Sequence, residues 1–240
     1  MPGTMFDSPL ARVLGLRRGD TVAFTGSGGK TTCAEALARS AGRTVLTTTT
    51  KMRVPERCLD PRSVDEVAAA LGPAPLILGR VADDGRKLVG PPRDVLEAVI
   101  AARVADLVVI EADGSRGASV KGYRDQEPVV PRGADHVVVL IGVDALGTGR
   151  HSPLVHRAER LWSLLGLDDE DVLDAPALAR AIFEQPGYLP AGCTLLLNKV
   201  DSPQALDAAH AIHEAIAPRL SGAARVLWRG RMLKGEVQAR

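Results

Sequence analysis

A glycine-rich segment near the start of the chain has the residue types that binding of a phosphate requires. It reads Thr-Gly-Ser-Gly-Gly-Lys-Thr-Thr over residues 25–32. Glycines allow the backbone to approach a phosphate and to turn N–H groups toward it, and the positive end of a following helix favours the anion. Lys30 can reach the β and γ phosphates, and the Thr31 hydroxyl can hold Mg²⁺. The segment therefore predicts a site for a nucleoside triphosphate with Mg²⁺. The residues expected to bind the nucleotide are Gly26, Ser27, Gly28, Gly29, Lys30, Thr31 and Thr32.

The match of this segment to the Walker pattern is incomplete at its first position. The full pattern places a glycine at position 24, where this chain has Phe24. The segment still lies between an expected strand and an expected helix, which is the context that the motif requires. We therefore predict nucleotide binding. The alternative is a glycine-rich turn whose lysine is merely solvated.

Two carboxylates follow an expected buried strand. Glu111 and Asp113 come directly after the aliphatic run Leu107 to Ile110. Ligands of open α/β sheets lie beyond the carboxyl ends of the strands, so a carboxylate there can hold Mg²⁺ or position a water molecule. We expect Thr31 and Glu111 to hold the metal, and Lys30, Glu111 and Asp113 to act in catalysis. The alternative is that the acidic residues only form a turn or cap the next element.

A run of threonines ends the second expected strand at the same edge of the sheet. It spans Thr47 to Thr50 and is followed by Lys51. Alternate side chains of a strand point to one face, so the last of them can meet the metal or the γ phosphate. Thr49 or Thr50, together with Lys51, are therefore candidate ligand contacts. A strand that is simply rich in threonine is the alternative, because threonine is a common strand residue.

The tetrapeptide Asn198-Lys199-Val200-Asp201 follows the expected strand Thr194 to Leu197. It is similar to the base-reading motif of GTP-binding proteins, in which an Asp accepts hydrogen bonds from guanine and a Lys stem covers the ring. The similarity implies that Asn198, Lys199 and Asp201 contact a nucleotide. Contact without selection of guanine, and a plain strand-to-helix turn, are the alternatives. The sequence therefore leaves both ATP and GTP open.

Alternating strand and helix patterns must position these residues. Strands are expected at residues 21–25, 43–49, 107–110, 136–143, 194–197 and 224–228, and helices at 31–41, 93–104, 157–165, 177–184 and 205–217. Parallel strands need crossover helices between them, so the pattern predicts an α/β fold like that of P-loop nucleoside triphosphatases. We expect a mostly parallel sheet flanked by helices, in a single nucleotide-binding domain over residues 1–240.

Two shorter patterns add detail to this fold. Residues 76–79 and 87–89 flank Asp84-Gly85, which predicts a small β-hairpin insertion. Ser63 lies three residues before Glu66, and this spacing predicts a capped helix start.

The composition is that of an ordinary globular protein, with 240 residues of which 45% are apolar and 25% charged. A net charge of +1 gives no electrostatic reason for a nucleic-acid or membrane-surface partner. No run approaches the roughly 18 apolar residues of a membrane span, and residues 1–20 do not resemble a signal peptide. We therefore expect a cytoplasmic protein. Three isolated cysteines exclude a disulfide framework or a thiolate zinc cluster.

Together these segments resemble the YqeC family, proteins associated with the maturation of selenium-dependent molybdenum hydroxylases. The resemblance is carried by residues 25–32, 47–52, 109–116, 121, 127–128, 143–147, 156–157 and 198–201. It implies a P-loop accessory protein whose partners are a nucleotide and such a hydroxylase or its cofactor. It also implies that His156 and Arg157, joined to Glu159, contact a phosphate or substrate. Gln126 stands where the resemblance leads us to expect a His before Glu127.

The positions of the lysines support a functional role for the segments that carry the resemblance. The chain has six lysines against 24 arginines, and four of the six fall in the shared segments: Lys30, Lys51, Lys121 and Lys199. In a chain so rich in arginine, this placement indicates that an ammonium group is specifically wanted there.

The loop also resembles that of the central domain of Mur-type ligases, which activate a carboxylate as an acyl phosphate. The chain is too short for the flanking domains of a full ligase. Our hypothesis is a Mg²⁺-dependent nucleoside triphosphatase or phosphoryl-transfer enzyme in selenium or molybdenum cofactor assembly. The alternatives are an acyl-phosphate ligase and a non-hydrolysing, nucleotide-dependent cofactor chaperone.

Overall fold

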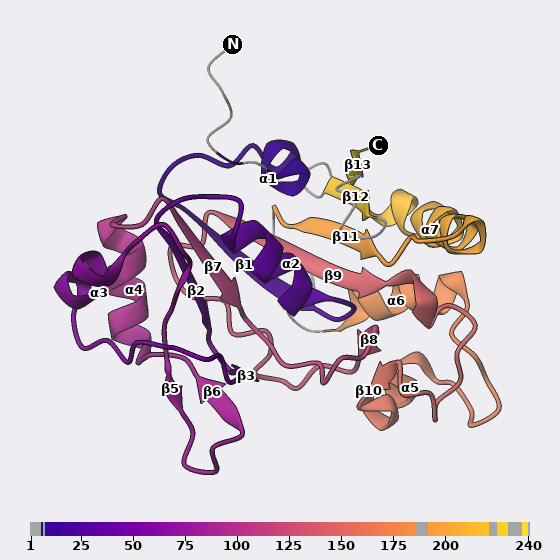
Figure 1. Ribbon diagram of the computed structural model, residues 1–240. Coiled ribbons are helices and arrows are strands. Elements are labelled where there is room, and N and C mark those ends of the chain that lie inside the picture. The colour runs from indigo at the N-terminus through magenta and orange to yellow at the C-terminus, as the bar shows by residue number, and fades with distance from the viewer. Residues whose placement is uncertain (1–5, 7, 186–191, 221–224, 230–236, 240) are drawn as a thin grey trace. The chain divides into compact units, whose positions relative to one another are not determined.

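A computed structural model describes residues 6, 8–185, 192–220, 225–229 and 237–239 (Figure 1). The chain divides into two compact units. The first comprises the residues up to Phe24, Thr31–Gly114 and Val129–Val137, and the second comprises Thr25–Lys30, Ser115–Pro128 and the residues from Val138 onward. Whether residues 1–240 form one domain, as predicted, is not tested by this division.

The first unit is built on parallel strands in the order β4-β2-β7-β1. Their bounds are β1 Asp20–Gly26, β2 Thr44–Thr48, β4 Leu76–Ile77 and β7 Leu107–Glu111. The last residues of β1, Thr25 and Gly26, belong to the second unit. Glu111 at the end of β7 is in register with Phe24 of β1 and Thr48 of β2. The carboxyl ends of three strands therefore meet at one edge.

Helices cover this sheet, and the strands β1, β2 and β7 are buried at every residue, as expected for parallel strands between helix layers. Helices α3 Val64–Ala70 and α4 Arg93–Ala102 lie side by side next to β2 and β7 (Figure 1). Their buried side chains form one core with those of the strands, which includes Val67, Val99 and Val108. The Ser63 hydroxyl accepts a hydrogen bond from the Glu66 N–H, which confirms the expected cap. The unit also contains α1 Pro9–Leu14 and most of α2 Lys30–Ala38.

The hairpin insertion is present, but its first strand differs from the prediction. Strands β5 Arg80–Val81 and β6 Lys87–Val89 pair antiparallel across the turn at Asp84-Gly85, and β6 also pairs with β3 Lys51–Arg53. Leu76–Ile77, which we assigned to the hairpin, is instead the parallel edge strand β4 beside β2. The chain leaves the sheet at Gly79, whose φ of 143° is open to glycine and not to other residues.

The second unit has strands in the order β9-β11-β12-β13, of which only β13 runs antiparallel to its neighbour. Their bounds are β9 His136–Gly142, β11 Thr194–Asn198, β12 Arg225–Arg229 and β13 Val237–Ala239. Helices α5 Ala158–Leu165, α6 Ala175–Glu184 and α7 Pro203–Ile216 pack in sequence, α5 on α6 and α6 on α7. Two short strands, β8 Val120–Lys121 and β10 Val155–His156, form a separate parallel pair, and η1 Val143–Ala145 and η2 Ala217–Arg219 are 3₁₀ turns.

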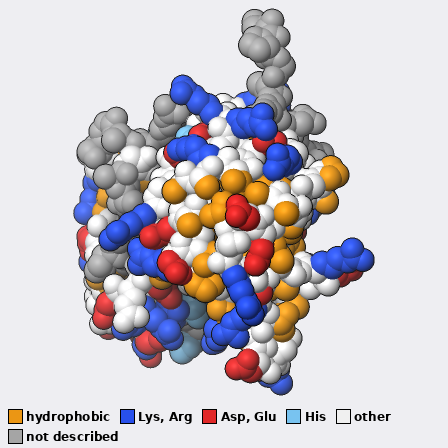
Figure 2. Space-filling model, turned by 90° about the vertical axis from the view of Figure 1, so that its left-hand side faces the viewer, with side chains coloured by type: hydrophobic (Ala, Val, Ile, Leu, Met, Phe, Trp, Pro, Cys, Tyr) orange, Lys and Arg blue, Asp and Glu red, His pale blue; other side chains and the backbone are white. Residues whose placement is uncertain are grey.

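The α/β prediction is confirmed, with parallel strands flanked by helices and a strand, loop and helix in the order expected for a phosphate loop. Figure 2 views the side on which α3 and α4 lie, where Lys and Arg side chains are interspersed with Asp and Glu around apolar ones. No patch of a single charge dominates that view. Over the described ranges, no helix is both long and apolar enough to cross a lipid bilayer.

Candidate functional site

The loop between β1 and α2 depends on glycine at three positions. Gly26, Gly28 and Gly29 have φ values of 86°, 93° and 114°, in the region that other residues rarely adopt. A Cβ atom at Gly26 would overlap the carbonyl oxygen of Leu140, and one at Gly28 would overlap the backbone of Gly142. Close packing on β9 and the backbone conformation therefore both require glycine here.

The second unit uses two of the loop's N–H groups itself. The Ser27 N–H donates to the Leu140 carbonyl at 2.8 Å, and the Gly28 N–H donates to the Ala118 carbonyl at 2.7 Å. The hydroxyls of Thr25 and Ser27 are buried, and neither has a hydrogen-bond partner in the part of the chain that the structure describes. The loop thus uses two of its N–H groups for packing, and its two buried hydroxyls remain without a hydrogen-bond partner among the described residues.

Lys30 folds back over the loop that precedes it. Its Nζ donates to the Gly26 carbonyl and, at 3.0 Å, to the Ser115 hydroxyl, and the residue is only 4% exposed. An ammonium group held across a row of backbone groups at a helix start is well placed to neutralise a phosphate.

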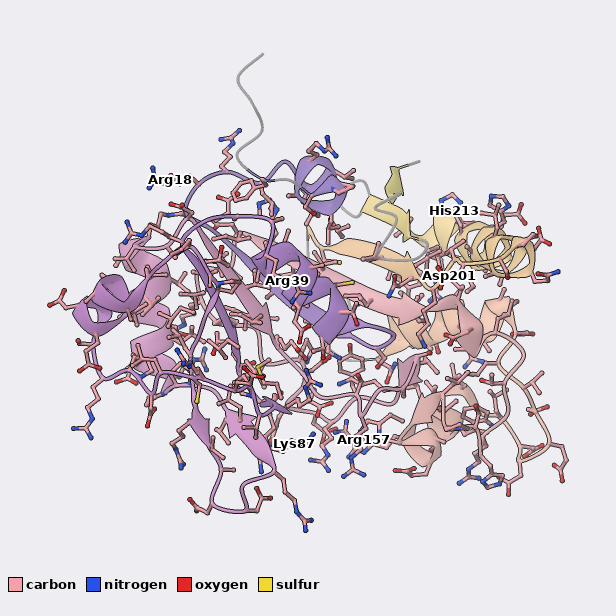
Figure 3. All side chains as sticks on the ribbon, in the orientation of Figure 1. Arg18, Arg39, Lys87, Arg157, Asp201 and His213 are labelled. Atoms are coloured by element: carbon pink, nitrogen blue, oxygen red, sulfur yellow. The ribbon has the colours of Figure 1, made fainter. Side chains whose placement is uncertain are left out.

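The Asn198–Asp201 segment meets the loop through its first residue. The Asn198 amide donates to the Gly28 carbonyl at 2.6 Å. The Lys199 ammonium donates to the Ser119 hydroxyl at 2.6 Å and to the Asp144 carboxylate at 2.8 Å. Asp201 is exposed at the start of the turn into α7 (Figure 3). Asn198 thus positions the loop, whereas the Asp201 carboxylate faces solvent.

Buried carboxylates and threonines gather at the carboxyl edge of the first unit. Glu111 is 6% and Asp113 is 1% exposed. The Glu111 carbonyl accepts hydrogen bonds from the Thr48 hydroxyl at 2.8 Å and the Thr49 N–H at 3.0 Å. The Thr49 hydroxyl donates to the Val129 carbonyl at 2.7 Å, so its proton is already used. A buried carboxylate is costly unless it is paired, hydrogen-bonded or bound to a metal.

The residues of this edge fit Mg²⁺ by the chemistry of their donor atoms. Glu111, Asp113 and the half-buried Thr31 offer carboxylate and hydroxyl oxygens, which are the ligands Mg²⁺ prefers. Within the described residues, no group of three or more His, Cys, Asp or Glu side chains could hold a metal by itself. Mg²⁺ commonly relies on one or two carboxylates, with phosphate and water oxygens completing its shell. Lys51 and Thr32 are exposed, and Thr50 is half-buried. Contact of these three residues with the nucleotide stays a prediction.

Comparison with known proteins places these features in one family. A family model described as YqeC protein matches residues 22–159. The chain belongs to the YqeC family. The Escherichia coli (strain K12) protein named "Uncharacterized protein YqeC" is 28% identical over 201 residues, which cover 77% of this chain and 78% of that protein. The residues matched to the YqeC model include the loop, Glu111, Asp113, His156 and Arg157, whereas Asn198 lies beyond them.

The YqeC-matched region contains a buried ion-pair cluster in the second unit. Both guanidinium N–H groups of Arg157 bind the Glu127 carboxylate, at 2.6 and 2.8 Å, and Lys121 Nζ donates to it at 3.0 Å. Lys121 is fully buried, and its Nζ lies 4.2 Å from the centre of the Tyr123 ring. Burial alone would raise the pKa of Glu127, but the hydrogen bonds from Arg157 and Lys121 lower it to about 2.

The contact of His156, Arg157 and Glu159 with a phosphate or substrate stays a prediction. Arg157 pairs with Glu127, and Glu159 is exposed on the first turn of α5. The parallel pairing of β8 and β10 sets His156 opposite Lys121 and so brings Arg157 toward the 121–127 segment. Figure 3 shows Arg157 and Asp201 apart from each other.

Sequence reasoning missed the residues that hold this cluster. Gln185 accepts a hydrogen bond from the Tyr123 N–H at 2.7 Å and donates to the carbonyls of Lys121 at 3.1 Å and Ala181 at 2.9 Å. A single glutamine after a helix carries no recognisable pattern. Lys121 had a signal, because it is one of only six lysines and lies in a segment shared with the YqeC family.

His156 should make the protein sensitive to mild acid. Burial, followed by the charges of Arg157 and Arg116, lowers the pKa of His156 from 6.5 to about 4. A group whose pKa is lower in the folded state adds stability above its unfolded pKa and loses it as the pH falls toward its folded pKa. We therefore expect the free energy of unfolding to fall between pH 6.5 and 4, and His156→Gln to flatten this fall.

Urea unfolding at several pH values measures this slope. His151→Gln is the control, because it removes an exposed imidazole and leaves His156 in place. An unchanged slope in His156→Gln would show that other groups cause the acid sensitivity.

Proposed function

We propose that this protein binds a nucleoside triphosphate with Mg²⁺ and hydrolyses or transfers its terminal phosphate, as an accessory in the maturation of selenium-dependent molybdenum hydroxylases. The observation that carries the proposal is the loop before α2. Three glycines with positive φ lead into a helix N-terminus, and the buried Lys30 ammonium lies over them. Such a loop binds phosphate because its backbone N–H groups and lysine complement the negative charge.

The residues of the site have distinct parts in this proposal. The Lys30 ammonium and the N-terminal end of α2 stabilise negative charge on the transferred phosphoryl group. Thr31 and Glu111 would hold Mg²⁺, which would supply positive charge against the phosphate oxygens. Asp113 orients the attacking water or acceptor. The link to molybdenum hydroxylases is supported only by the family resemblance, and nucleotide binding can be tested without it.

The base is the part of the nucleotide that Asp201 is expected to read. Isothermal titration of the Mg²⁺ complexes of ATP and GTP into the wild type tests the proposal directly. We expect Asp201→Asn to weaken GTP binding at least tenfold, because an amide places a donor opposite the guanine donors, and to leave ATP binding nearly unchanged. Each tenfold loss corresponds to about 1.4 kcal/mol.

Asp207→Asn is the matched control, since Asp207 is an exposed carboxylate on the neighbouring helix α7. If Asp201→Asn weakened the binding of ATP and GTP equally, Asp201 would not read the base. The proposal that the loop binds phosphate would be unaffected by that result. Absence of binding by both nucleotides in the wild type with Mg²⁺ present would overturn the proposed function itself.

A further inference from the structure

A cavity of about 480 Å³ lies in the first unit along α2, outside the loop itself. One wall is a stripe that begins at Thr31 in the first turn of α2, continues through Glu35 and ends at Arg39, the residue directly after α2. Residues four apart share one face of a helix, so this stripe is a continuous surface. Figure 3 labels Arg39 beside the end of α2. The cavity thus extends from the residue that follows Lys30 along the whole helix.

The lining also carries Arg53 and Arg57 with Glu56 between them in the sequence, and among the described residues Glu56 forms no ion pair with either arginine. Arg53 ends β3, and Arg57 lies in the segment that follows. Arg39 is paired with Glu35 across 3.6 Å, but within the described ranges Arg53 and Arg57 form no ion pair. Both side chains are exposed at the cavity. Planar guanidinium groups bind carboxylates and phosphates through two parallel hydrogen bonds, so this wall favours an oxyanion.

The segment that carries Arg57 is anchored to the sheet. The Leu59 N–H donates to the Ile77 carbonyl at 2.9 Å, and the Gly79 N–H donates to the Leu59 carbonyl at 2.8 Å. These bonds attach the segment beside the edge strand β4 two residues after Arg57. The arginine wall therefore rests on ordered backbone, which reduces the entropy lost when a ligand binds.

The floor of the cavity is apolar. Leu46 of β2, Met52 of β3 and Ile77 of β4 line it, and Met52 and Leu46 are 7% and 4% exposed. An apolar floor with a few convergent polar groups is typical of a small-molecule site, and its volume lies in the range that such sites have. The ligand that matches this cavity is an organic anion with an apolar body.

We propose that this cavity binds the acceptor of the phosphoryl group, an organic molecule that presents a carboxylate or a phosphate monoester to Arg53 and Arg57. This proposal rests on the proposed function. In the transfer, an acceptor oxygen forms a bond to the γ phosphorus while the bond from that phosphorus to the β–γ bridging oxygen breaks. The electron pair of the broken bond leaves with the nucleoside diphosphate. A carboxylate or phosphate oxygen enters already deprotonated, so no base is required.

Ligand-observed NMR titrations with simple probes test the cavity without nucleotide. Benzoate and phenyl phosphate present the two oxyanions on one apolar ring, and benzamide is the neutral analogue. We expect at least one of the two anions to bind at least tenfold more tightly than benzamide, and the stronger of them identifies the acceptor group. The double variant Arg53→Gln/Arg57→Gln should weaken anion binding at least tenfold, and a thermal melt verifies that it folds.

The matched control is Arg62→Gln/Arg86→Gln, which removes two exposed arginines of the same unit outside the cavity. Binding of benzamide as tight as that of both anions, unchanged anion binding in Arg53→Gln/Arg57→Gln, or displacement of the anions by ATP or GTP would each overturn the acceptor site. Because the titration omits nucleotide, Lys30→Met should still bind the anions. If the wild type binds the anions but no nucleotide, the proposed function is overturned and only an anion site remains. If it binds nucleotide but not the anions, only the proposal of an acceptor site is overturned.

Discussion

Replacing Lys30 with methionine should reduce phosphate release from ATP or GTP at least a hundredfold and weaken binding of both at least tenfold. Loss of one group that stabilises transition-state charge costs about 10²–10³ in rate. Methionine keeps an apolar stem of similar length and removes only the ammonium. The side chain's hydrogen bonds to the Gly26 carbonyl and the Ser115 hydroxyl are lost as well, so the melting temperature must be measured alongside activity.

Lys87→Met is the control for this experiment. Lys87 is an exposed lysine of the hairpin, far along the chain from the loop, and Figure 3 labels it. Calorimetric titration measures binding, and a coupled assay measures phosphate release under multiple turnover. Wild-type turnover in a folded Lys30→Met protein would contradict a phosphate-loop mechanism. Turnover that is absent from the wild type while binding persists would favour a nucleotide-dependent chaperone.

Replacing Glu127 with alanine should lower the free energy of unfolding by about 3–5 kcal/mol, the cost of removing one partner of a buried ion pair. The loss is large because Lys121 is fully buried and Arg157 largely so, with side-chain exposures of 0% and 14%. Without Glu127, the Lys121 and Arg157 side chains lose the carboxylate that both of them pair with. Urea denaturation at pH 7 measures the change.

Glu159→Ala provides the comparison, because that carboxylate is exposed and makes no contribution to the cluster. A surface ion pair contributes at most about 1 kcal/mol. If Glu127→Ala lowered the free energy of unfolding by less than this, the cluster would not stabilise the fold as a buried ion pair. The wild-type contribution also has a pH window. The pKa of Glu127 falls from 4.5 to about 2 on folding, so its stabilisation is complete above pH 4.5 and is lost as the pH falls toward 2.

The parts of the fold that the sequence predicted are those set by local pattern. The strands β7 and β11 are built around the aliphatic residues 107–110 and 195–197 and are buried at every residue, and glycines with lysine and threonine marked the turn into α2. The hairpin was wrong at its first strand because Leu76–Ile77 is short and its pairing with β2 depends on a distant partner. Two apolar residues before a glycine carry no information about which strand they join.

The candidate site was predictable where a motif lies on one stretch of chain, and unpredictable where contacts are long-range. Arg157 and Glu127 are separated by 30 residues, and Gln185 and Tyr123 by 62. Those pairings follow from how β8, β10 and α6 pack, and a single sequence does not contain that information. Likewise, the hydrogen bond of Asn198 to the Gly28 carbonyl joins residues 170 apart.

The hydrogen bond from Asn198 to Gly28 connects the glycine-rich loop to the last residue of β11. The Gly28 carbonyl accepts from the Asn198 amide, the Gly28 N–H donates to the Ala118 carbonyl, and the Lys199 ammonium donates to Ser119 and Asp144. A ligand that changes the backbone conformation of Gly28 would therefore act on bonds to Asn198 and Ala118, the sequence neighbours of Lys199 and Ser119. If ligand binding at the loop changes the affinity for a second ligand at Lys199, thermodynamic reciprocity requires the second ligand to change the affinity of the loop by the same factor.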